Sequence, residues 1–274
     1  MTQIKPDIRD LTGLATNAAM QAGEAIMEIY RSGITVSSKE DESPLTNADR
    51  ASHQIIVKAL RPTGIYILSE EGDHGTYSER SGEDYLWVID PLDGTKEFIN
   101  KNGEFTVNIA LIEGNCPVLG VVYAPDKGVL YAANKQDGAY KWELENGNHS
   151  IKSIAPKKLP LDPVNRPLTI VASRSHQNPD TVEFIQKMEA QKKGTVKVIS
   201  AGSSLKLCLV AENSADYYPR PAPTMEWDTA AGDAVCRFSG CAVVNWDTGV
   251  PLTYNKENLT NPKFLVKRTD GERI

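Results

Sequence analysis

Two carboxylates and a hydroxyl lie close together in the segment Asp90-Pro91-Leu92-Asp93-Gly94-Thr95, directly after an apolar run at 85–89. Proline cannot donate a hydrogen bond to a neighbouring strand, so Pro91 is predicted to end the strand. Glycine adopts backbone conformations that other residues avoid, so Gly94 permits a sharp turn and the close approach of a ligand. Asp90 and Asp93 can then face one point, which is the composition of a metal site.

Acidic residues stand at two comparable junctions. Glu70-Glu71 follows the apolar run 65–68, and Glu226-Trp227-Asp228 precedes a predicted helix at 229–238. If Glu70, Asp90, Asp93 and Asp228 converge, each like-charged pair about 4 Å apart costs roughly 4 kcal/mol, so a cation must lie among them. Oxygen ligands favour Mg²⁺ first, with Mn²⁺ or Ca²⁺ behind it. The alternative for any single acid is a helix cap or a solvated turn residue.

These motifs resemble the signatures of the inositol monophosphatase superfamily of Mg²⁺-dependent, lithium-sensitive phosphatases. The signatures are an acidic pair after a strand, Asp-Pro-hydrophobic-Asp-Gly-Thr, and Trp-Asp-x-Ala-Ala-Gly, and all occur here in that order. Within the superfamily the chain most closely resembles the bacterial 3'(2'),5'-bisphosphate nucleotidases of the cysteine-biosynthesis branch. The resemblance spans nearly the whole chain and is carried by residues 41–49, 68–71, 90–108, 173–176, 202–206 and 227–232.

The resemblance implies an α/β fold, a layered α-β-α-β-α sandwich of the inositol monophosphatase and fructose-1,6-bisphosphatase type. It also implies a site for two or three Mg²⁺ ions. In such a site one ion polarises the attacking water, and a second stabilises the leaving oxygen of an in-line displacement. The implied metal ligands are Glu70, Asp90, Asp93, Asp228 and the backbone carbonyl of Leu92. Glu71 is a weaker match and is expected behind the ligands or in solvent.

Thr95 and Asp49 match the family's water-activating pair, and Glu70 is counted with them as catalytic. The Thr95 hydroxyl can orient the water or accept its proton, provided that a carboxylate supports it. The alternative readings are a turn hydroxyl for Thr95 and an acid favoured by the helix dipole for Asp49.

Further matches imply contacts to a phosphorylated nucleotide. His176 follows a predicted strand, Lys206 adds a point charge, and Arg220 can bind phosphate through paired hydrogen bonds. Ser203 precedes a predicted helix, whose first amides suit an anion. The implied substrate contacts are Glu70, Leu92, Asp93, Gly94, Thr95, His176, Ser203, Lys206, Arg220 and Asp228.

The chain has 274 residues and a formal net charge of -6. This charge argues against a nucleic-acid polymer as partner, because binding a phosphate backbone depends on a surplus of Lys and Arg. No apolar run could span a bilayer and the start shows no secretory signal, so we predict a cytoplasmic protein. The resemblance leaves open a peripheral association with the cytoplasmic side of the inner membrane. The cysteines lack zinc-type spacing and are predicted to be reduced and packed in the core.

Periodicity predicts the elements that position these residues. Apolar residues at helical spacing predict helices at 8–30 and 46–60, joined by a polar loop at 37–44 that could reach over a site. Short runs between 105 and 142 predict an antiparallel meander. After residue 168, strands at 168–172 and 196–199 alternate with helices at 180–190 and 204–211. A proline-rich stretch at 156–167 predicts a boundary between an N-terminal α+β domain at 1–155, with the metal motifs, and a C-terminal α/β domain at 156–274, with substrate contacts.

The function implied is hydrolysis of the 3'-phosphate of adenosine 3',5'-bisphosphate to AMP and phosphate, with 3'-phosphoadenylyl sulfate as a further substrate. An inositol-phosphate or fructose-bisphosphate phosphatase with the same metals stays open, as does a non-catalytic metal or nucleotide sensor. The segment 96–99 and the set His176, Lys206 and Arg220 favour the nucleotidase. Thr95 argues against a sensor, because binding alone needs no water-activating hydroxyl. A haloacid-dehalogenase-type phosphatase fits less well, since its acids are separated by one residue. Oligomeric state, substrate preference and the number of metals at turnover stay open.

Overall fold

The computed structural model describes residues 6–38, 44–144, 151, 154–162, 166–172, 178–192 and 196–269. Its helices are α1 (Ile8–Ser32), α2 (Asn47–Leu60), η1 (Arg61–Thr63), α3 (Tyr77–Arg80), α4 (Thr95–Ile99), α5 (Pro179–Lys192), α6 (Leu205–Ala211) and α7 (Glu226–Arg237). The larger sheet has seven strands, in the spatial order β3 (Tyr66–Ser69), β4 (Tyr85–Asp93), β5 (Thr106–Glu113), β6 (Cys116–Ala124), β7 (Val129–Asn134), β8 (Gly138–Glu143) and β9 (Lys157–Lys158).

The smaller sheet has five strands, in the spatial order β11 (Lys197–Ser200), β10 (Thr169–Ala172), β12 (Tyr217–Arg220), β16 (Phe264–Arg268) and β14 (Cys241–Asn245). Two short antiparallel pairs accompany the sheets, β1 (Val36–Ser38) with β2 (Pro44–Thr46), and β13 (Thr224–Met225) with β15 (Thr260–Asn261).

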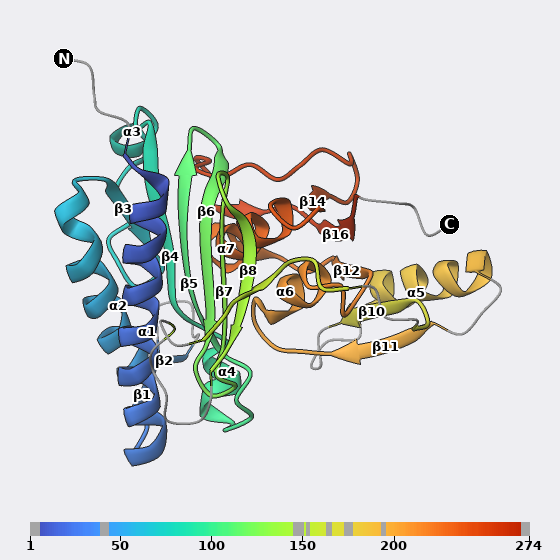
Figure 1. The fold of residues 1–274 in the computed structure, drawn as a ribbon, viewed down its shortest axis with the longest axis horizontal. Helices are drawn as coiled ribbons and strands as arrows, with labels where there is room; N and C mark the ends of the chain where they lie inside the picture. Colours follow the sequence, from blue (N-terminus) through green and yellow to red (C-terminus); the bar gives the residue numbers. More distant parts are fainter. Residues whose placement is uncertain are drawn as a thin grey trace.

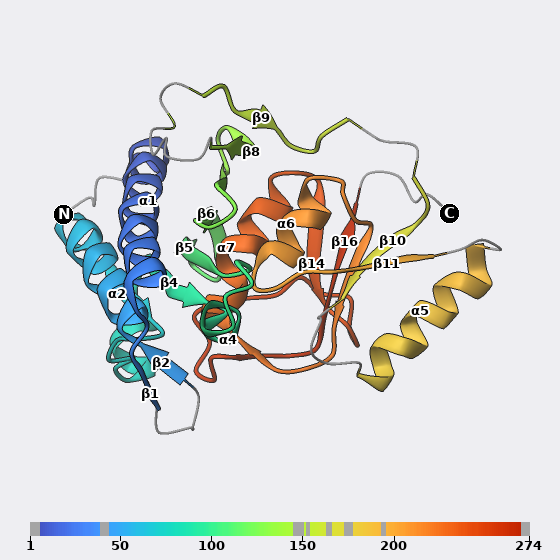
Figure 2. The same ribbon diagram turned by 90° about the horizontal axis from the view of Figure 1, so that it is seen from below.

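Helices and sheets alternate as five layers (Figures 1 and 2). α1 and α2 cover one face of the larger sheet, α6 and α7 lie between the two sheets, and α5 covers the outer face of the smaller sheet. α5 docks through Phe184, whose ring centroid lies 5.7 Å from that of Tyr217 on β12. The predicted α-β-α-β-α layering is therefore confirmed.

Both faces of the larger sheet are buried, which explains the unbroken apolar run before Asp90. Along β4, Leu86 and Val88 belong to the core shared with α6, α7 and the smaller sheet. Trp87 and Ile89 point to the opposite core, under α1 and α2. Successive strand side chains face opposite sides, so a strand covered on both faces is apolar throughout.

Most predicted elements are confirmed within a few residues. α1 and α2 match the predicted N-terminal helices, and β5 to β8 form the predicted antiparallel meander. β10, α5, β11 and α6 match the alternating strands and helices predicted after residue 168.

Three expectations are wrong in detail. Pro91 does not end β4, which continues to Asp93 through an irregularity between Asp90 and Asp93. α7 begins at Glu226, three residues before the predicted start at Thr229. The flanks of the predicted loop at 37–44 pair as β1 and β2, while its middle, 39–43, lies outside the described residues.

The cysteine prediction holds for Cys208, Cys236 and Cys241, which are free and buried, but Cys116 is exposed. Among the described helices, none is long and apolar enough to cross a membrane. β9, which follows residue 155, pairs with β8 in the larger sheet, and the division into domains at 155 stays a prediction.

Candidate functional site

The irregular end of β4 brings the acids of the Asp90–Thr95 segment into the centre of the molecule. Asp90 still pairs with Asn108 on β5, but the register then shifts, so that Asp93 pairs with Thr106. A β-bulge of this kind redirects the side chains that follow it. The Leu92 amide donates to Asp90 Oδ1 at 3.0 Å, which fixes the turn from inside.

Gly94 ends the turn and α4 begins at Thr95. Gly94 has φ of 91°, in the left-handed region where glycine is favoured. A Cβ at this position would lie 2.1 Å from Ser203 Oγ, on the segment before α6. The glycine therefore lets the N-terminal and C-terminal halves of the chain meet at this point.

Asp90 is the buried centre of the predicted acidic cluster, with 1% of its surface exposed. Burial raises the pKa of Asp90 well above its usual range, and the charges of Glu70, Asp93 and Asp228 raise it further. The Glu70 carboxyl also shares a hydrogen bond with Asp90. The charges of the other three predicted acids therefore all act on Asp90, so the structure brings the four together around it.

Asp93 joins the turn to the start of α6. Its Oδ2 accepts from the Ser204 amide at 2.7 Å and from the Ser204 hydroxyl at 2.8 Å, and Asn108 Nδ2 lies 3.3 Å away. Neither Ser204 nor Asn108 is predicted from the sequence to bind Asp93. Ser204 adjoins the predicted contact Ser203, but nothing local indicates that it binds a carboxylate 111 positions away.

Asp228 lies in the first turn of α7 and is half-buried. Its Oδ2 accepts from the Met225 amide at 2.8 Å, so it also caps the helix. Burial and the charge of Asp93 raise the pKa of Asp228 to about 8, although the Met225 hydrogen bond opposes this shift. Asp228 therefore caps α7 and also belongs to the acidic cluster.

The donor set fits a hard divalent cation. Each predicted side-chain ligand offers oxygen, which such a cation prefers. Burial and the neighbouring carboxylates raise the pKa of Asp90 and of Asp228, and a cation would offset both effects. As the side chains stand, no group of three or more His, Cys, Asp or Glu within the described ranges has the arrangement of a metal shell. Asp93 and Asp228 each turn an oxygen towards an amide instead. Carboxylate oxygens reorient by side-chain rotation alone, so these acids would direct oxygens to an ion without a change in the backbone. The metal assignment is therefore a proposal.

Thr95 and Asp49 meet as predicted, although they come from different elements. Thr95 Oγ1 donates to Asp49 Oδ1 at 3.3 Å, and Asp49 is 1% exposed. The other oxygen, Oδ2, accepts from the Thr46 amide at 2.7 Å and closes the capping box of α2. Ser52 Oγ donates to the Pro91 carbonyl at 2.6 Å and fixes α2 against the turn. Asp49 therefore caps a helix and supports a hydroxyl at once.

A cavity of about 200 Å³ opens beside Asp93, Gly94 and Asp228. Lys206 and Arg220 line it together with Lys96, Tyr218, Thr224 and Phe264. Lys206 is 6% exposed, and burial lowers the pKa of its ammonium to about 8. Its Nζ donates to the Ser203 carbonyl at 2.8 Å and lies 5.6 Å from the centre of the Tyr218 ring. Two predicted cationic contacts thus flank the acids.

The remaining predicted contacts differ in outcome. The Ser203 hydroxyl is within hydrogen-bond distance of the Asp93 and Glu104 carbonyls, at 2.8 and 2.7 Å, so a contact from Ser203 to an anion would have to come from its backbone amide. His176 lies outside the described residues. Glu71 acts on His53. Burial lowers the pKa of His53, and the charge of Glu71 partly opposes that shift.

The layered fold and the enclosed carboxylates, flanked by a cationic cavity, define a phosphatase of the α/β sandwich class. The chain belongs to the inositol monophosphatase family, whose model matches residues 7–272. This confirms the resemblance inferred from the sequence.

Similar proteins extend over most of the chain. It is 44% identical over 253 residues to the 3'(2'),5'-bisphosphate nucleotidase CysQ of Shigella flexneri, a match that covers 90% of this chain and 96% of that protein. The crystal structure of CysQ from Bacteroides thetaiotaomicron, a bacterial member of the inositol monophosphatase family, has a TM-score of 0.85 and 46% identity, covering 96% of this chain and 98% of that one. SaIMPase-II with bound 2'AMP has a TM-score of 0.71 and 25% identity, covering 95% of this chain and 89% of that one.

Proposed function

We propose that this chain is a 3'(2'),5'-bisphosphate nucleotidase that hydrolyses the 3'-phosphate of adenosine 3',5'-bisphosphate to AMP and phosphate. 3'-Phosphoadenylyl sulfate is its second expected substrate. The observation that carries the proposal is one cavity lined both by the carboxylates Asp93 and Asp228 and by the cations Lys206 and Arg220. This suits a substrate with two phosphate groups. One phosphate reacts at the metal site, and the other needs cationic side chains outside that site. Two relatives that cover most of the chain, from Shigella flexneri and Bacteroides thetaiotaomicron, are named CysQ.

Two or three Mg²⁺ ions would be held by Glu70, Asp90, Asp93, Asp228 and the backbone carbonyl of Leu92. The bound metal supplies a polarised water and stabilises charge on the leaving oxygen. Asp93 accepts hydrogen bonds from the Ser204 amide and hydroxyl, and Asp90 accepts one from the Leu92 amide, so both carboxylates are anchored next to the site.

Thr95 and Asp49 move the proton of the attacking water. Thr95 Oγ1 donates its own hydrogen to Asp49 Oδ1, which leaves its lone pairs for a proton from the water. As the water oxygen bonds to phosphorus, its proton passes to Thr95 Oγ1 and the Thr95 hydrogen passes to Asp49 Oδ1. The bond from phosphorus to the 3'-oxygen breaks, and this oxygen takes a proton from solvent to become the 3'-hydroxyl of AMP. A single displacement inverts the configuration at phosphorus, whereas an aspartyl-phosphate intermediate would give net retention.

Thr95→Ala tests this role against Thr95→Ser, which keeps the hydroxyl. Proton transfer by a positioned group contributes about 10²- to 10⁴-fold, so we expect Thr95→Ala to lower kcat by about that factor. Thr95→Ser should retain most of the activity. Equal kcat values for Thr95→Ala and the wild type would remove Thr95 from the mechanism.

Substrate choice is tested by phosphate release from adenosine 3',5'-bisphosphate, inositol 1-phosphate and fructose 1,6-bisphosphate, each with and without Mg²⁺. Charge-assisted hydrogen bonds contribute roughly 1.5–3 kcal/mol, so Lys206→Met and Arg220→Gln should each lower kcat/KM for the nucleotide about 10- to 100-fold. Inositol 1-phosphate, which carries one phosphate, should lose less. Lys263→Ala, in an exposed pair with Asp180, is the control.

The same measurements decide between the nucleotidase and the inositol-phosphate phosphatase. Faster turnover of inositol 1-phosphate than of the nucleotide would favour the latter. Equal losses on both substrates in the two variants would mean that Lys206 and Arg220 support the fold or the metal site, and the nucleotide-specific role would fail. The cytoplasmic location and the possible contact with the inner membrane remain predictions.

A further inference from the structure

The chain segment that follows Glu70 is fastened to the C-terminal half through Arg80. This residue ends α3 and is 3% exposed. Its guanidinium donates to Asn255 Oδ1 at 2.6 Å and to the Lys256 carbonyl at 2.8 Å. Asn255 Nδ2 donates back to the Arg80 carbonyl at 3.0 Å. The reciprocal bonds fix α3 against a turn 175 positions later in the chain.

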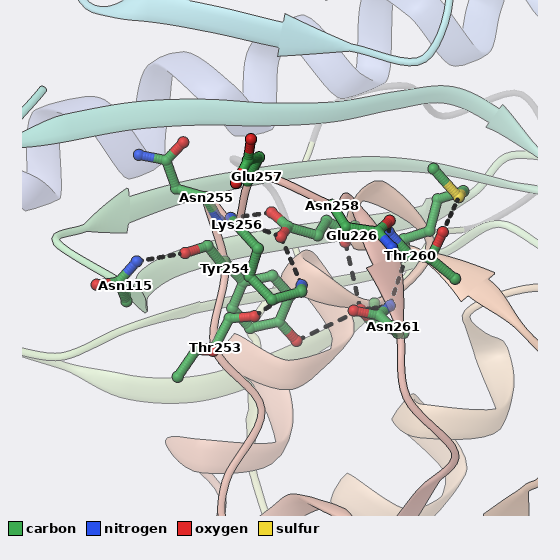
Figure 3. A network of polar contacts seen from close by, with 12 residues as sticks. Asn115, Glu226, Thr253, Tyr254, Asn255, Lys256, Glu257, Asn258, Thr260 and Asn261 are labelled. Atoms are coloured by element: carbon green, nitrogen blue, oxygen red, sulfur yellow. Dashed lines mark hydrogen bonds and ion pairs between the residues drawn. The ribbon is translucent and has the colours of Figure 1, made fainter. Parts of the chain in front are cut away.

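Glu226 fixes the same turn against the start of α7 (Figure 3). It is 0% exposed, and its Oε2 accepts from the Asn255 amide at 2.6 Å. Its Oε1 accepts from the Lys256 amide at 2.9 Å and from Lys256 Nζ at 2.5 Å. Both oxygens of this carboxylate are therefore used. A glutamine would have to place its NH₂ group against an N–H donor.

A second contact joins the same two segments. The His74 ring, between Glu70 and α3, lies 4.9 Å from the Trp227 ring, centre to centre. Trp227 immediately precedes Asp228, and Glu226 stands two residues before it. The segment that carries Glu70 and the turn that carries Asp228 are thus held together by an aromatic contact and by Arg80, Asn255 and Glu226.

Such a restraint matters because Glu70 and Asp228 repel each other. Both are carboxylates next to the fastened segments, Glu70 ten residues before Arg80 and Asp228 two residues after Glu226. In the absence of a cation, like charges that are free to move drift apart. Bringing them back together then costs free energy, which weakens metal binding. A fixed framework removes that cost.

We propose that Arg80, Asn255 and Glu226 form a clamp that sets the spacing of Glu70 and Asp228 and thereby the affinity for Mg²⁺. The inference rests on the proposed function. The three clamp residues are positioning residues, since their bonds go to each other and to the 255–257 turn. The clamp differs from an ordinary structural network in that its loss should weaken metal binding more than the chemical step.

The test compares Asn255→Gly, Arg80→Met and Glu226→Gln with the wild type. Mg²⁺ affinity is measured by calorimetry without substrate, and the Mg²⁺ concentration for half-maximal phosphate release is measured separately. Loss of a residue that orients a metal ligand costs about 10- to 100-fold in affinity, so we expect at least about tenfold weaker binding in each variant. The kcat at saturating Mg²⁺ should stay within about twofold, because the ligands and Thr95 are intact.

Asn255→Gly is the sharpest variant. Asn255 has φ of 63°, which glycine adopts freely, so the change removes the side-chain amide without straining the backbone. It decides the question if Arg80→Met does not fold. The matched control is Tyr131→Phe, which removes a buried hydrogen bond of 2.8 Å to Glu212 that involves no residue of the clamp. It should lower Tm and leave Mg²⁺ affinity unchanged.

Asn255→Gly with a lowered Tm but wild-type Mg²⁺ affinity would overturn the clamp and leave the proposed function intact. The same holds if Tyr131→Phe weakens Mg²⁺ binding as much as the clamp variants do. A wild-type chain that binds no Mg²⁺ and releases no phosphate would instead overturn the proposed function, and the inference with it.

Discussion

Asp90 combines a structural cost with a proposed ligand role. Its carboxyl is buried, shares a hydrogen bond with Glu70, and has a raised pKa because of burial and three neighbouring acids. In Asp90→Asn the side-chain amide donates a hydrogen bond to Glu70. It replaces the hydrogen bond that the Asp90 and Glu70 carboxyls share. We therefore expect the free energy of unfolding without Mg²⁺ to rise by about 1 kcal/mol or more. Turnover should fall more than about 100-fold, because a lost ligand costs more than a lost supporting residue.

Asp93→Asn provides the contrast for this prediction. Asp93 Oδ2 accepts from Ser204, so the amide form can lose native bonds that Asp90→Asn keeps. Denaturant unfolding should show Asp90→Asn as more stable than the wild type and Asp93→Asn as less stable. Near-normal turnover in either variant would contradict the metal assignment.

Lys206 gives the site a pH dependence. Burial lowers the pKa of Lys206 to about 8, while Asp93, Glu97 and Glu104 raise it and Arg220 lowers it. The ammonium is charged below pH 8 and neutral above, so kcat/KM for adenosine 3',5'-bisphosphate should fall as the pH rises through about 8. In Lys206→Met the value should be low already and should not show this step. A wild-type kcat/KM that stays constant up to about pH 9.5 would contradict the prediction.

The same shift affects stability with a defined sign. The folded pKa lies below the usual 10.5, so the unfolded chain binds the proton more tightly between about pH 8 and 10.5. The free energy of unfolding therefore gains a contribution that rises with pH across this window. Lys206→Met should lack that contribution in unfolding measurements.

At the scale of elements, the β4–α4 turn depends on Gly94. An alanine there would meet Ser203 Oγ at 2.1 Å and the Glu104 carbonyl at 3.2 Å, in a left-handed backbone conformation. We expect Gly94→Ala to lower the free energy of unfolding by about 1–3 kcal/mol and to reduce turnover strongly, because the turn carries Asp93 and Thr95.

Gly114→Ala is the matched control for this turn. Gly114 also has positive φ, but its added Cβ would meet nothing within 4 Å. It should therefore show the backbone strain alone, with normal turnover. Equal effects of the two substitutions on Tm and activity would mean that the contact with Ser203 is unimportant.

At the scale of the whole molecule, Mg²⁺ should link the two halves of the chain. Asp90 and Asp93 come from β4 of the larger sheet and Glu70 from the turn that follows β3, whereas Asp228 comes from the helix layer between the sheets. A ligand that binds only the folded state adds about 2.7 kcal/mol at 100 times its Kd. We expect Mg²⁺ to raise Tm by about 5 °C or more at that concentration. The rise should be much smaller in Asp228→Asn, and a Tm independent of Mg²⁺ would contradict the link.

The sequence by itself determined the segments that carry the chemistry. The carboxylates, Thr95 and Gly94 stand in motifs whose turn and strand signals are local, and local signals also predicted α1, α2 and the meander. Residues such as Lys206 and Arg220 needed the resemblance, because nothing in their neighbours marks them. Local rules could place each acid on an element but could not bring the elements together.

The tertiary structure decided the contacts between distant segments. Pro91 lies inside β4 rather than at its end, because pairing with β5 resumes beyond the bulge. Glu226, the first residue of α7, is buried because the turn at 255–256 supplies its hydrogen bonds. Asp93 with Ser204 and Arg80 with Asn255 are 111 and 175 positions apart. Pairing over such separations depends on how the sheets and helices pack, and no local pattern in the chain encodes it.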